Sequence, residues 1–257
     1  MITRILSVLA LLACLFPTAT RAEEARLAVA ANFTSVAQLL ADAYAAQSGH
    51  HIALSSGSTG KLYAQIRQGA PFDVFLAADR VTPQRLLDEG LAVPGSLHDY
   101  ALGRLVLLSA HAGVGQADET LLREHDFRTF AIANPRLAPY GVAAREALAH
   151  IDRLTALEPH FVLGENIAQA AQYVITGNAD AGLVPWSLAL ELPANTTATW
   201  WLLPGDWHAP IVQSAVLLKR AEHNPAASGF LAWLQSDAAK ALIARHGYGE
   251  VTAPAPD

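Results

Sequence analysis

The chain has 257 residues, of which 52% are hydrophobic and 16% are charged. This composition excludes an intrinsically disordered protein, and the length is enough for one large domain or two smaller ones. Beyond the N-terminal segment, no stretch reaches the roughly 18 apolar residues that a membrane-spanning helix needs. We therefore expect a folded chain that buries sizeable hydrophobic cores.

The N-terminal segment has the pattern of a secretory signal peptide. Arg4 precedes a short apolar run, and small residues occupy the two positions that a signal peptidase reads before Ala22. We expect a signal peptide over residues 1–22, cleavage after Ala22 and export to the periplasm. A minor alternative makes Cys14 a lipoprotein anchor, because Leu-Leu-Ala precedes it.

Export changes the charge and the cysteine content. Of 17 basic residues, Arg4 and Arg21 leave with the signal, so 15 remain against 23 acidic residues and the formal charge moves from −6 to −8. Such an acidic balance gives no basic stripe for a nucleic acid. Cys14 is the single cysteine, so the mature chain has no disulfide, no thiolate metal site and no cysteine nucleophile.

Short apolar runs alternate with segments of helical periodicity along the mature chain. The first run, residues 27–31, precedes a helix in which Val36, Leu39, Leu40, Ala43 and Tyr44 share one face, and which Gly49 ends. Further strands are expected at residues 51–55, 73–77, 105–108, 130–133, 161–163, 181–184 and 211–218. Further helices are expected at residues 62–69, 81–88, 141–150 and 167–177, after Asn224-Pro225, and at 237–247.

This alternation predicts an α/β fold in which each lobe has a mixed, mainly parallel sheet flanked by helices. No Gly/Ser linker separates the halves, so we expect two lobes joined by a hinge of ordered strands. Lobe I is expected to comprise residues 23–102 and 206–257, and lobe II residues 103–205. Ligands of open α/β sheets bind at the carboxyl ends of strands, against helix N-termini, and in two lobes these ends can face one another across a cleft.

Four strand-to-helix turns place polar or small residues where a helix begins. They contain Asn32, the pair Ser58 and Thr59, Tyr140, and Ile167. Free backbone N–H groups at such positions can hold an anion without a cationic side chain. Asn32, Ser58 and Asn166 are also preferred helix caps when each is taken alone. Their occurrence at successive turns indicates a binding site.

The same turns contain partial matches to known phosphate-binding and catalytic motifs. Residues 57–61 hint at a phosphate-binding loop, but Ser55 and Leu62 occupy the positions that require Gly and Ser or Thr. Ser58 and Lys61 match the Ser-x-x-Lys motif of β-lactamase-like hydrolases, without that family's later motifs. The 10 histidines form no His-Glu-x-x-His zinc motif. A periplasmic serine hydrolase using Ser58 and Lys61 is therefore the enzymatic alternative.

Six segments match one family of exported proteins. They are residues 29–33, 57–66, 69–79, 138–141, 164–167 and 245–248. The most specific is Gly-Ala-Pro-Phe-Asp-Val-Phe-Leu-Ala-Ala-Asp at residues 69–79. In these segments, and in their order along essentially the whole mature chain, the sequence resembles the periplasmic molybdate-binding proteins of ABC importers.

The resemblance implies a periplasmic binding protein of the type II-like, two-lobe kind that closes on one tetrahedral oxyanion. It implies molybdate, and tungstate with it, as the ligand, delivered to the permease and ATPase components of an ABC importer. It implies no enzymatic activity, no cofactor and no metal cation site, since the molybdenum is bound as its oxyanion. It implies a monomer. The alternative within binding proteins is another oxyanion: sulfate, thiosulfate or tungstate only.

The resemblance also implies the ligand-binding residues. Thr59 matches the hydroxyl position, with Ser58 beside it, and Ile167 matches a position that donates its backbone N–H. Some family members place a tyrosine where this chain has Pro185, and Tyr140 is expected to substitute for it. The complete expected set is Asn32, Ser58, Thr59, Tyr140 and Ile167.

Overall fold

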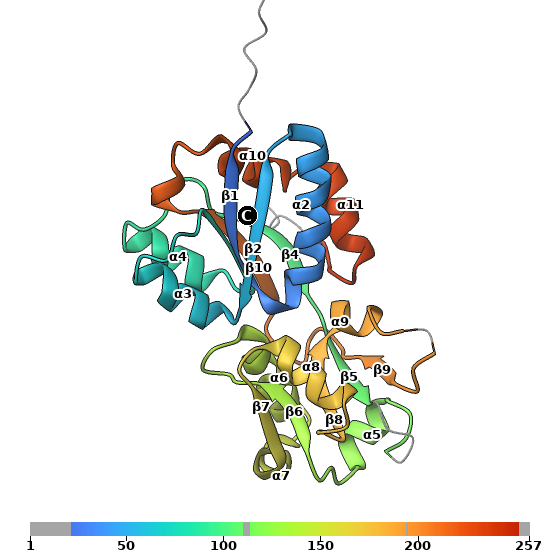
Figure 1. Ribbon diagram of the computed structural model, residues 1–257. Helices are drawn as coiled ribbons and strands as arrows, with labels where there is room; N and C mark the ends of the chain where they lie inside the picture. The colour runs from blue at the N-terminus through green and yellow to red at the C-terminus, as the bar shows by residue number, and fades with distance from the viewer. Residues whose placement is uncertain (1–21, 110–113, 194, 252–257) are drawn as a thin grey trace, which may run out of the picture.

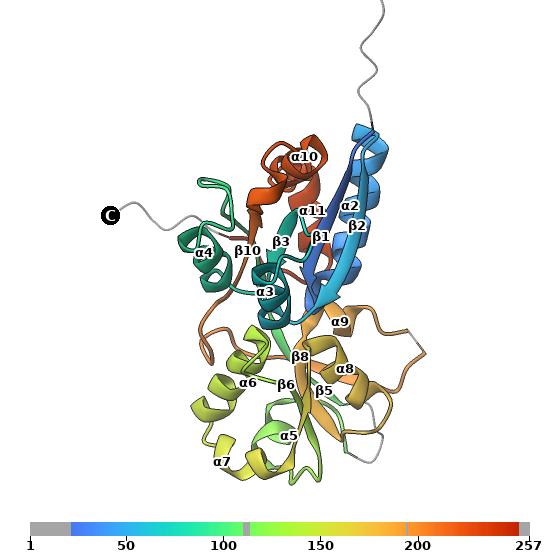
Figure 2. The same ribbon diagram turned by 60° about the vertical axis from the view of Figure 1, so that its left-hand side comes forward.

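The computed structural model describes residues 22–109, 114–193 and 195–251. The expected signal peptide up to Arg21, with Cys14, lies outside the described residues. The described chain forms two lobes, one above the other in Figure 1 and again in the turned view of Figure 2. Each lobe is built on one five-stranded sheet. No helix in the described ranges is long and apolar enough to cross a membrane.

Lobe I contains the first and last described elements of the chain. Its sheet has the order β2-β1-β3-β10-β4. β1 pairs in parallel with β2 and β3, whereas β10 runs antiparallel to β3 and β4. The strands are β1 (Glu24–Ala30), β2 (His51–Gly57), β3 (Val74–Ala77), β4 (His98–Gly103) and β10 (Ile211–Leu217).

Helices cover both faces of the lobe I sheet with separate apolar cores. One core joins the sheet to α2 (Thr34–Ser48), α10 (Pro225–Trp233) and α11 (Asp237–Arg245). The other joins it to α3 (Thr59–Arg67) and α4 (Val81–Asp88). Short 3-10 turns, η2 (Ala31–Phe33) and η4 (Lys219–Ala221), follow β1 and β10.

Lobe II repeats this plan with the sheet order β7-β6-β8-β5-β9. β6 is parallel to β7 and β8, and β5 is antiparallel to β8 and β9. The strands are β5 (Leu105–Ser109), β6 (Phe130–Ala133), β7 (Phe161–Gly164), β8 (Ala181–Pro185) and β9 (Thr199–Leu202). The helices are α5 (Glu119–Glu124), α6 (Pro139–His150), α7 (Leu154–Leu157), η3 (Glu158–His160), α8 (Ile167–Ile175) and α9 (Trp186–Leu190).

The chain passes between the lobes twice. Arg104 alone separates β4 from β5, and residues 203–210 lead from β9 back to β10. The crossings join strands to strands, as expected for an ordered hinge. The predicted α/β fold of two lobes with mixed sheets is confirmed.

Local signals in the sequence explain several element ends. Gly49 ends α2 with a φ of 75°, a conformation that favours glycine. The Asn224 side chain caps α10 as expected, accepting hydrogen bonds from two N–H groups of its first turn. α11 begins at Asp237 as expected, and the Ser236 side chain caps it by accepting from the Ala239 N–H.

The buried face of α2 also differs in part from the expected one. Val36, Leu40 and Tyr44 are buried, but Leu39 is 42% exposed and Ala43 is exposed as well. The buried stripe continues instead through Ala37 and Ala41. Small alanines let the helix lie close to its neighbours, so the stripe follows the contact surface rather than the largest apolar side chains.

Candidate functional site

A small cavity lies where the two lobes meet. Three of its walls are turns that lead into α3, α6 and α8, and a fourth is η2 at the end of β1. The structure brings all five residues expected from the sequence to this one place, and each is at most 3% exposed. The lining residues are Ala30, Ala31, Asn32, Ser58, Thr59, Ala78, Ala138, Pro139, Tyr140, Asn166 and Ile167.

The cavity wall is uncharged. Its side chains are aliphatic, hydroxyl, phenol or amide groups, and none carries a carboxylate or a cation. The helix N-termini of α3, α6 and α8 at this wall supply partial positive charge and N–H groups without an intrahelical partner. This combination favours an anion that accepts hydrogen bonds and donates none.

Ser58 stands at the N-cap position of α3 but does not cap it. Its side chain makes no capping hydrogen bond, and its Oγ is buried without any partner in the described part of the chain. By contrast, the Asn166 side chain caps α8, accepting from the Gln169 N–H at 3.0 Å. A buried hydroxyl without a partner is costly, so Ser58 is the hydroxyl at this wall that a ligand would satisfy.

Thr59 differs from Ser58 because its hydroxyl already has a structural task. Its Oγ1 accepts a hydrogen bond from the Ala78 N–H at 3.1 Å, which ties the start of α3 to the end of β3. The hydroxyl proton of Thr59 remains available for donation. The geometry therefore favours Ser58 as the principal hydroxyl donor, with Thr59 beside it.

Asn32 is held in a polar network rather than acting as a helix cap. Its Nδ2 donates to Gln213 Oε1 at 2.9 Å and to the Tyr248 hydroxyl at 3.2 Å. Its main-chain oxygen accepts from the Tyr248 hydroxyl at 2.6 Å and from Ser187 Oγ at 3.3 Å. Since Ser187 belongs to lobe II and Asn32 to lobe I, this network crosses the lobe boundary.

Tyr140 is buried at the start of α6. Its hydroxyl oxygen accepts from Gln213 Nε2 at 3.2 Å. Burial raises the pKa of Tyr140 well above its ordinary value, and burial likewise raises the pKa of Tyr248. Both phenols therefore keep their protons, and Tyr140 can act as a neutral donor.

Comparison with known proteins places this geometry in a family. The model of the bacterial extracellular solute-binding proteins matches residues 25–249. The chain belongs to this family. Curated relatives show that it is of the ModA type. The molybdate-binding protein ModA of Azotobacter vinelandii is 43% identical over 242 residues, which cover 94% of this chain and 96% of the relative. ModA of Rhodobacter capsulatus is 40% identical over 227 residues, covering 88% of each.

Solved structures agree with this assignment. The periplasmic molybdate-binding protein of Azotobacter vinelandii has a TM-score of 0.83 at 36% identity, covering 89% of this chain and all of that one. The sulfate-binding protein SubI of Mycobacterium tuberculosis has a TM-score of 0.71 at 15% identity, covering 89% of this chain and 86% of that one, and shows the fold alone. This solute-binding protein thus has the two-lobe architecture of the solved structures that it resembles.

The lobes of this solute-binding protein touch beside the cavity. The Gly60 N–H donates to the Leu137 carbonyl across the boundary at 2.9 Å. Lys61 Nζ forms an ion pair with the Glu165 carboxylate, also across the boundary, and both side chains are about half exposed. The structure is therefore a closed one, in which the lobes already meet around the cavity.

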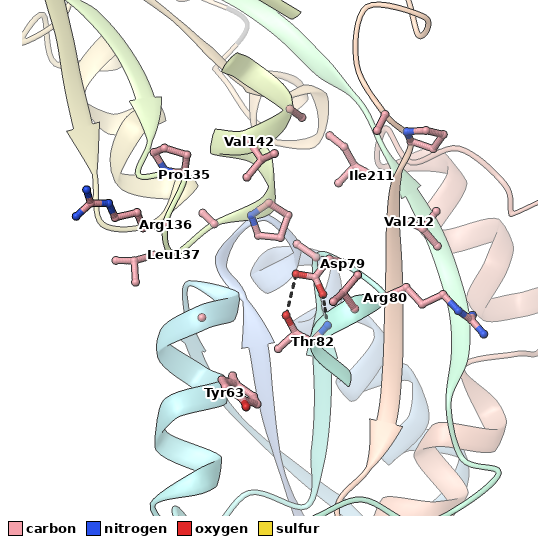
Figure 3. Close-up of a pocket in the computed structure, with 18 of the residues that line it drawn as sticks. Tyr63, Asp79, Arg80, Thr82, Pro135, Arg136, Leu137, Val142, Ile211 and Val212 are labelled. Carbon is pink, nitrogen blue, oxygen red and sulfur yellow. Dashed lines mark hydrogen bonds between the residues drawn. The ribbon is translucent and has the colours of Figure 1, made fainter. Parts of the chain in front are cut away.

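A larger groove adjoins the cavity between the lobes, and Figure 3 shows the side chains that line it. It shares Ala78, Ala138 and Pro139 with the cavity. Unlike the cavity, it contains carboxylates. Asp79 accepts from the Thr82 N–H and hydroxyl at 2.7 and 3.0 Å, and burial raises the pKa of Asp79. Arg80, Arg85 and Arg136 line the same groove, so it carries charges of both signs. The cavity differs from the groove because its donors are all neutral.

The hydrolase alternative loses its base in this structure. Lys61 Nζ pairs with Glu165, and Ser58 Oγ has no hydrogen-bond partner within the described ranges. A serine nucleophile needs a base within hydrogen-bond reach, so this pair does not form a catalytic unit. Nor does the described chain contain a group of three or more His, Cys, Asp or Glu residues placed to hold a metal ion.

Three residues near the cavity were missed by the sequence analysis. Ser187 gave no signal. Tyr248 lies in a matched segment, residues 245–248, but was given no role. Gln213 carried a usable signal, because it is a large polar residue inside a largely apolar strand and so needs buried hydrogen-bond partners.

Proposed function

We propose that this chain binds molybdate in the cavity between its lobes and delivers it to the permease and ATPase of an ABC importer. The observation that carries the proposal is the buried, uncharged wall of donors, with the unpartnered Ser58 hydroxyl at its centre. The two relatives named as molybdate-binding, at 43% and 40% identity over most of the chain, support this ligand.

The chemistry of the wall selects among oxyanions. Molybdate is a dianion that accepts hydrogen bonds and offers none, which matches neutral donors and helix N-termini. Phosphate carries a proton near neutral pH and needs an acceptor, but no carboxylate lines the cavity. Sulfate has the same charge and shape as molybdate but is smaller. If the cavity is rigid, sulfate cannot reach all the hydrogen-bond donors of the wall at once. Tungstate resembles molybdate in size and charge and should bind as well.

The proposed ligand donors are the side chains of Ser58, Thr59 and Tyr140, the turn of Asn32, and the backbone N–H of Ile167. Ile167 is the first residue of α8, so its N–H has no partner within the helix. Pro185 ends β8 and has neither a hydroxyl nor an N–H to give. We propose that the phenol of Tyr140 supplies the donor in its place.

The setting of the protein is part of the proposal. We propose export to the periplasm with cleavage after Ala22, and action as a monomer. The proposed lobes, residues 23–102 with 206–257 and residues 103–205, then close on the ligand as two units. The solved relative named as periplasmic supports this location.

Calorimetric titration of the mature protein with molybdate, tungstate, sulfate and phosphate tests the proposal. Each charge-assisted hydrogen bond contributes about 1.5–3 kcal/mol, and the costs of association and closure offset much of the sum. We expect a dissociation constant on the order of 10–100 nM for molybdate, about −10 kcal/mol. Equal affinity for sulfate would instead assign the protein to another oxyanion.

A further inference from the structure

Gln213 is the most deeply buried polar side chain near the cavity. It lies on the hinge strand β10 and is 0% exposed. The pairing of β10 with β4 shifts register between Gln213 and Ser214. A register shift of this kind changes the direction in which the neighbouring side chains point. A buried amide of this kind is stable only where its donors and acceptors are matched.

The Gln213 amide connects the two lobes of the proposed site. Its Oε1 accepts from Asn32 Nδ2 at 2.9 Å and from the Tyr100 hydroxyl at 3.1 Å. Its Nε2 donates to the Tyr140 hydroxyl oxygen at 3.2 Å. Asn32 comes from lobe I and Tyr140 from lobe II, and both line the cavity, whereas Gln213 itself does not.

The direction of the Gln213–Tyr140 bond determines where the phenol proton can go. An amide nitrogen only donates, so the Tyr140 oxygen must accept from it. The amide of Gln213 therefore occupies an accepting position of this oxygen. No described side chain or carbonyl is hydrogen-bonded to the phenol proton, which leaves it for the cavity.

The hinge is shaped to hold this arrangement. A Cβ added at Gly103 would lie 2.3 Å from the Tyr140 hydroxyl oxygen and 3.0 Å from Gln213 Nε2. The first distance is far inside van der Waals contact and the second is tighter than an ordinary contact, so glycine at the end of β4 leaves room for the hydroxyl beside the amide. Residues from the hinge thus fix the position of a group in the cavity wall.

We propose that Gln213 is a positioning residue that directs the Tyr140 hydroxyl proton toward the cavity, so that the site favours a fully deprotonated oxyanion over one that carries a proton. A protonated ligand such as hydrogen phosphate would have to displace the Gln213 amide in order to donate to the phenol oxygen. The inference rests on the proposed function and adds the group that controls its selectivity.

A double-mutant cycle tests the coupling. Gln213→Met keeps the length of the side chain and removes both polar groups, and Tyr140→Phe removes the hydroxyl. We expect each single change to weaken molybdate binding about tenfold, which corresponds to the loss of one charge-assisted hydrogen bond. We expect the double variant to bind about as Tyr140→Phe does, because Gln213 acts through that hydroxyl. A loss of about a hundredfold, the product of the singles, would overturn the proposal, as would wild-type affinity in Gln213→Met.

Selectivity gives a readout that a purely structural role would not move. Phosphate competition against molybdate is measured at a pH of about 6, where phosphate is protonated. We expect the ratio of the phosphate and molybdate dissociation constants to fall about tenfold in Gln213→Met, because an accepting position on Tyr140 opens. The ratio should stay unchanged in Tyr44→Phe, a buried tyrosine remote from the cavity. An unchanged ratio in Gln213→Met, or no phosphate competition in either protein, would refute the selectivity.

Two further measurements keep the outcomes separate. Thermal melting of every variant without ligand shows whether the fold is intact. The Gly103→Ala variant tests the packing around the Tyr140 hydroxyl without changing Gln213. We expect Gly103→Ala to lower the apo melting temperature much less in the Tyr140→Phe background, since the crowding hydroxyl is gone; an equal loss in both backgrounds contradicts the proposed packing. If wild type fails to bind molybdate, the proposed function fails. If it binds and the cycle is additive, only the role of Gln213 fails.

Discussion

Two adjacent hydroxyls in one turn have different surroundings. Ser58 Oγ is buried without a partner, whereas Thr59 Oγ1 accepts from the Ala78 N–H. The first hydroxyl stabilises nothing in the fold itself, and the second holds two elements together. Mutations at these positions should therefore separate binding from stability.

Ser58→Ala should weaken molybdate binding by about 1.5–3 kcal/mol, roughly ten- to a hundredfold, and leave apo stability nearly unchanged. Thr59→Val is the matched control, because it leaves the buried Ala78 N–H without an acceptor and should cost about 1–3 kcal/mol of stability. Titration beside urea unfolding measures both effects. Wild-type binding in Ser58→Ala together with a large loss in Thr59→Val would make Thr59 the principal hydroxyl ligand.

The buried tyrosines predict how stability depends on pH. Burial raises the pKa of Tyr100, Tyr140 and Tyr248 in the folded protein. Between the unfolded value near 10 and the higher folded values, the folded state binds more protons, so the free energy of unfolding falls as pH rises. Their contribution is complete below a pH of about 10. Urea unfolding at pH 8 and 10.5 should show a loss that shrinks in Tyr100→Phe; a rise in stability would contradict the shifts.

At the scale of elements, the sequence predicted several helices and strands with the bounds that the structure gives. The bounds expected for α4 and β6, residues 81–88 and 130–133, agree with the structure. β4 and β9 were not predicted. Both are edge strands with one neighbour. β4 begins with the polar pair His98 and Asp99 and so has no long apolar run, whereas β9 lies in the short apolar run of residues 200–203, from which no strand was predicted. α9 is too short, at 5 residues, for helical periodicity to show.

The site was predictable where its residues sit in local turns and not where contacts are long-range. Ser58 and Ile167 stand at helix starts, which are visible as strand-to-helix turns. The partners of Asn32 are 181 and 216 residues away in the sequence, at Gln213 and Tyr248. No spacing rule connects such distances, because only the complete fold of lobe I, whose sheet contains both β1 and β10, brings these segments together.

The first turn of α8 offers a test of backbone donation. Ile167→Val should leave affinity within about threefold, since the N–H stays and the volume barely changes. Ile167→Pro removes the N–H at a helical position that tolerates proline, so it should weaken binding far more than it lowers apo stability. Titration and apo melting of both variants decide this point. Normal binding by Ile167→Pro would show that lobe II does not use this N–H.

At the scale of the whole molecule, charge is kept at the rim and out of the cavity. Lys61 with Glu165, and Ser35 with Glu191 at 3.0 Å, join the lobes through side chains that water reaches. Exposed pairs of this kind contribute about 0.2–1 kcal/mol and are screened by salt. These exposed pairs contribute a small part of the free energy of closing the lobes, whereas the neutral cavity wall is the proposed binding surface for the ligand.

Molybdate affinity should therefore depend weakly on ionic strength. Between roughly 0.05 and 0.5 M salt, where the screening length shortens to a few ångströms, we expect a change of less than about threefold. Lys61→Ala should bind within the same range and remove part of that small dependence. Titration at several salt concentrations checks this, and a tenfold loss would indicate a cationic ligand, with Lys61 and Arg136 as the first residues to examine.

The double crossing between the lobes has a consequence for the order in which the protein folds. β10 follows all of lobe II along the chain, yet it lies between β3 and β4 in the lobe I sheet, and β4 has no other strand neighbour. The pairs of β10 with β3 and β4 join residues farther apart in the chain than any described strand pair of lobe II, and closing shorter loops costs less entropy. Lobe II should thus become protected first, and lobe I should complete only after β10 arrives. In pulse-labelled hydrogen exchange during refolding, amides of β6 and β8 should gain protection before those of β4 and β10.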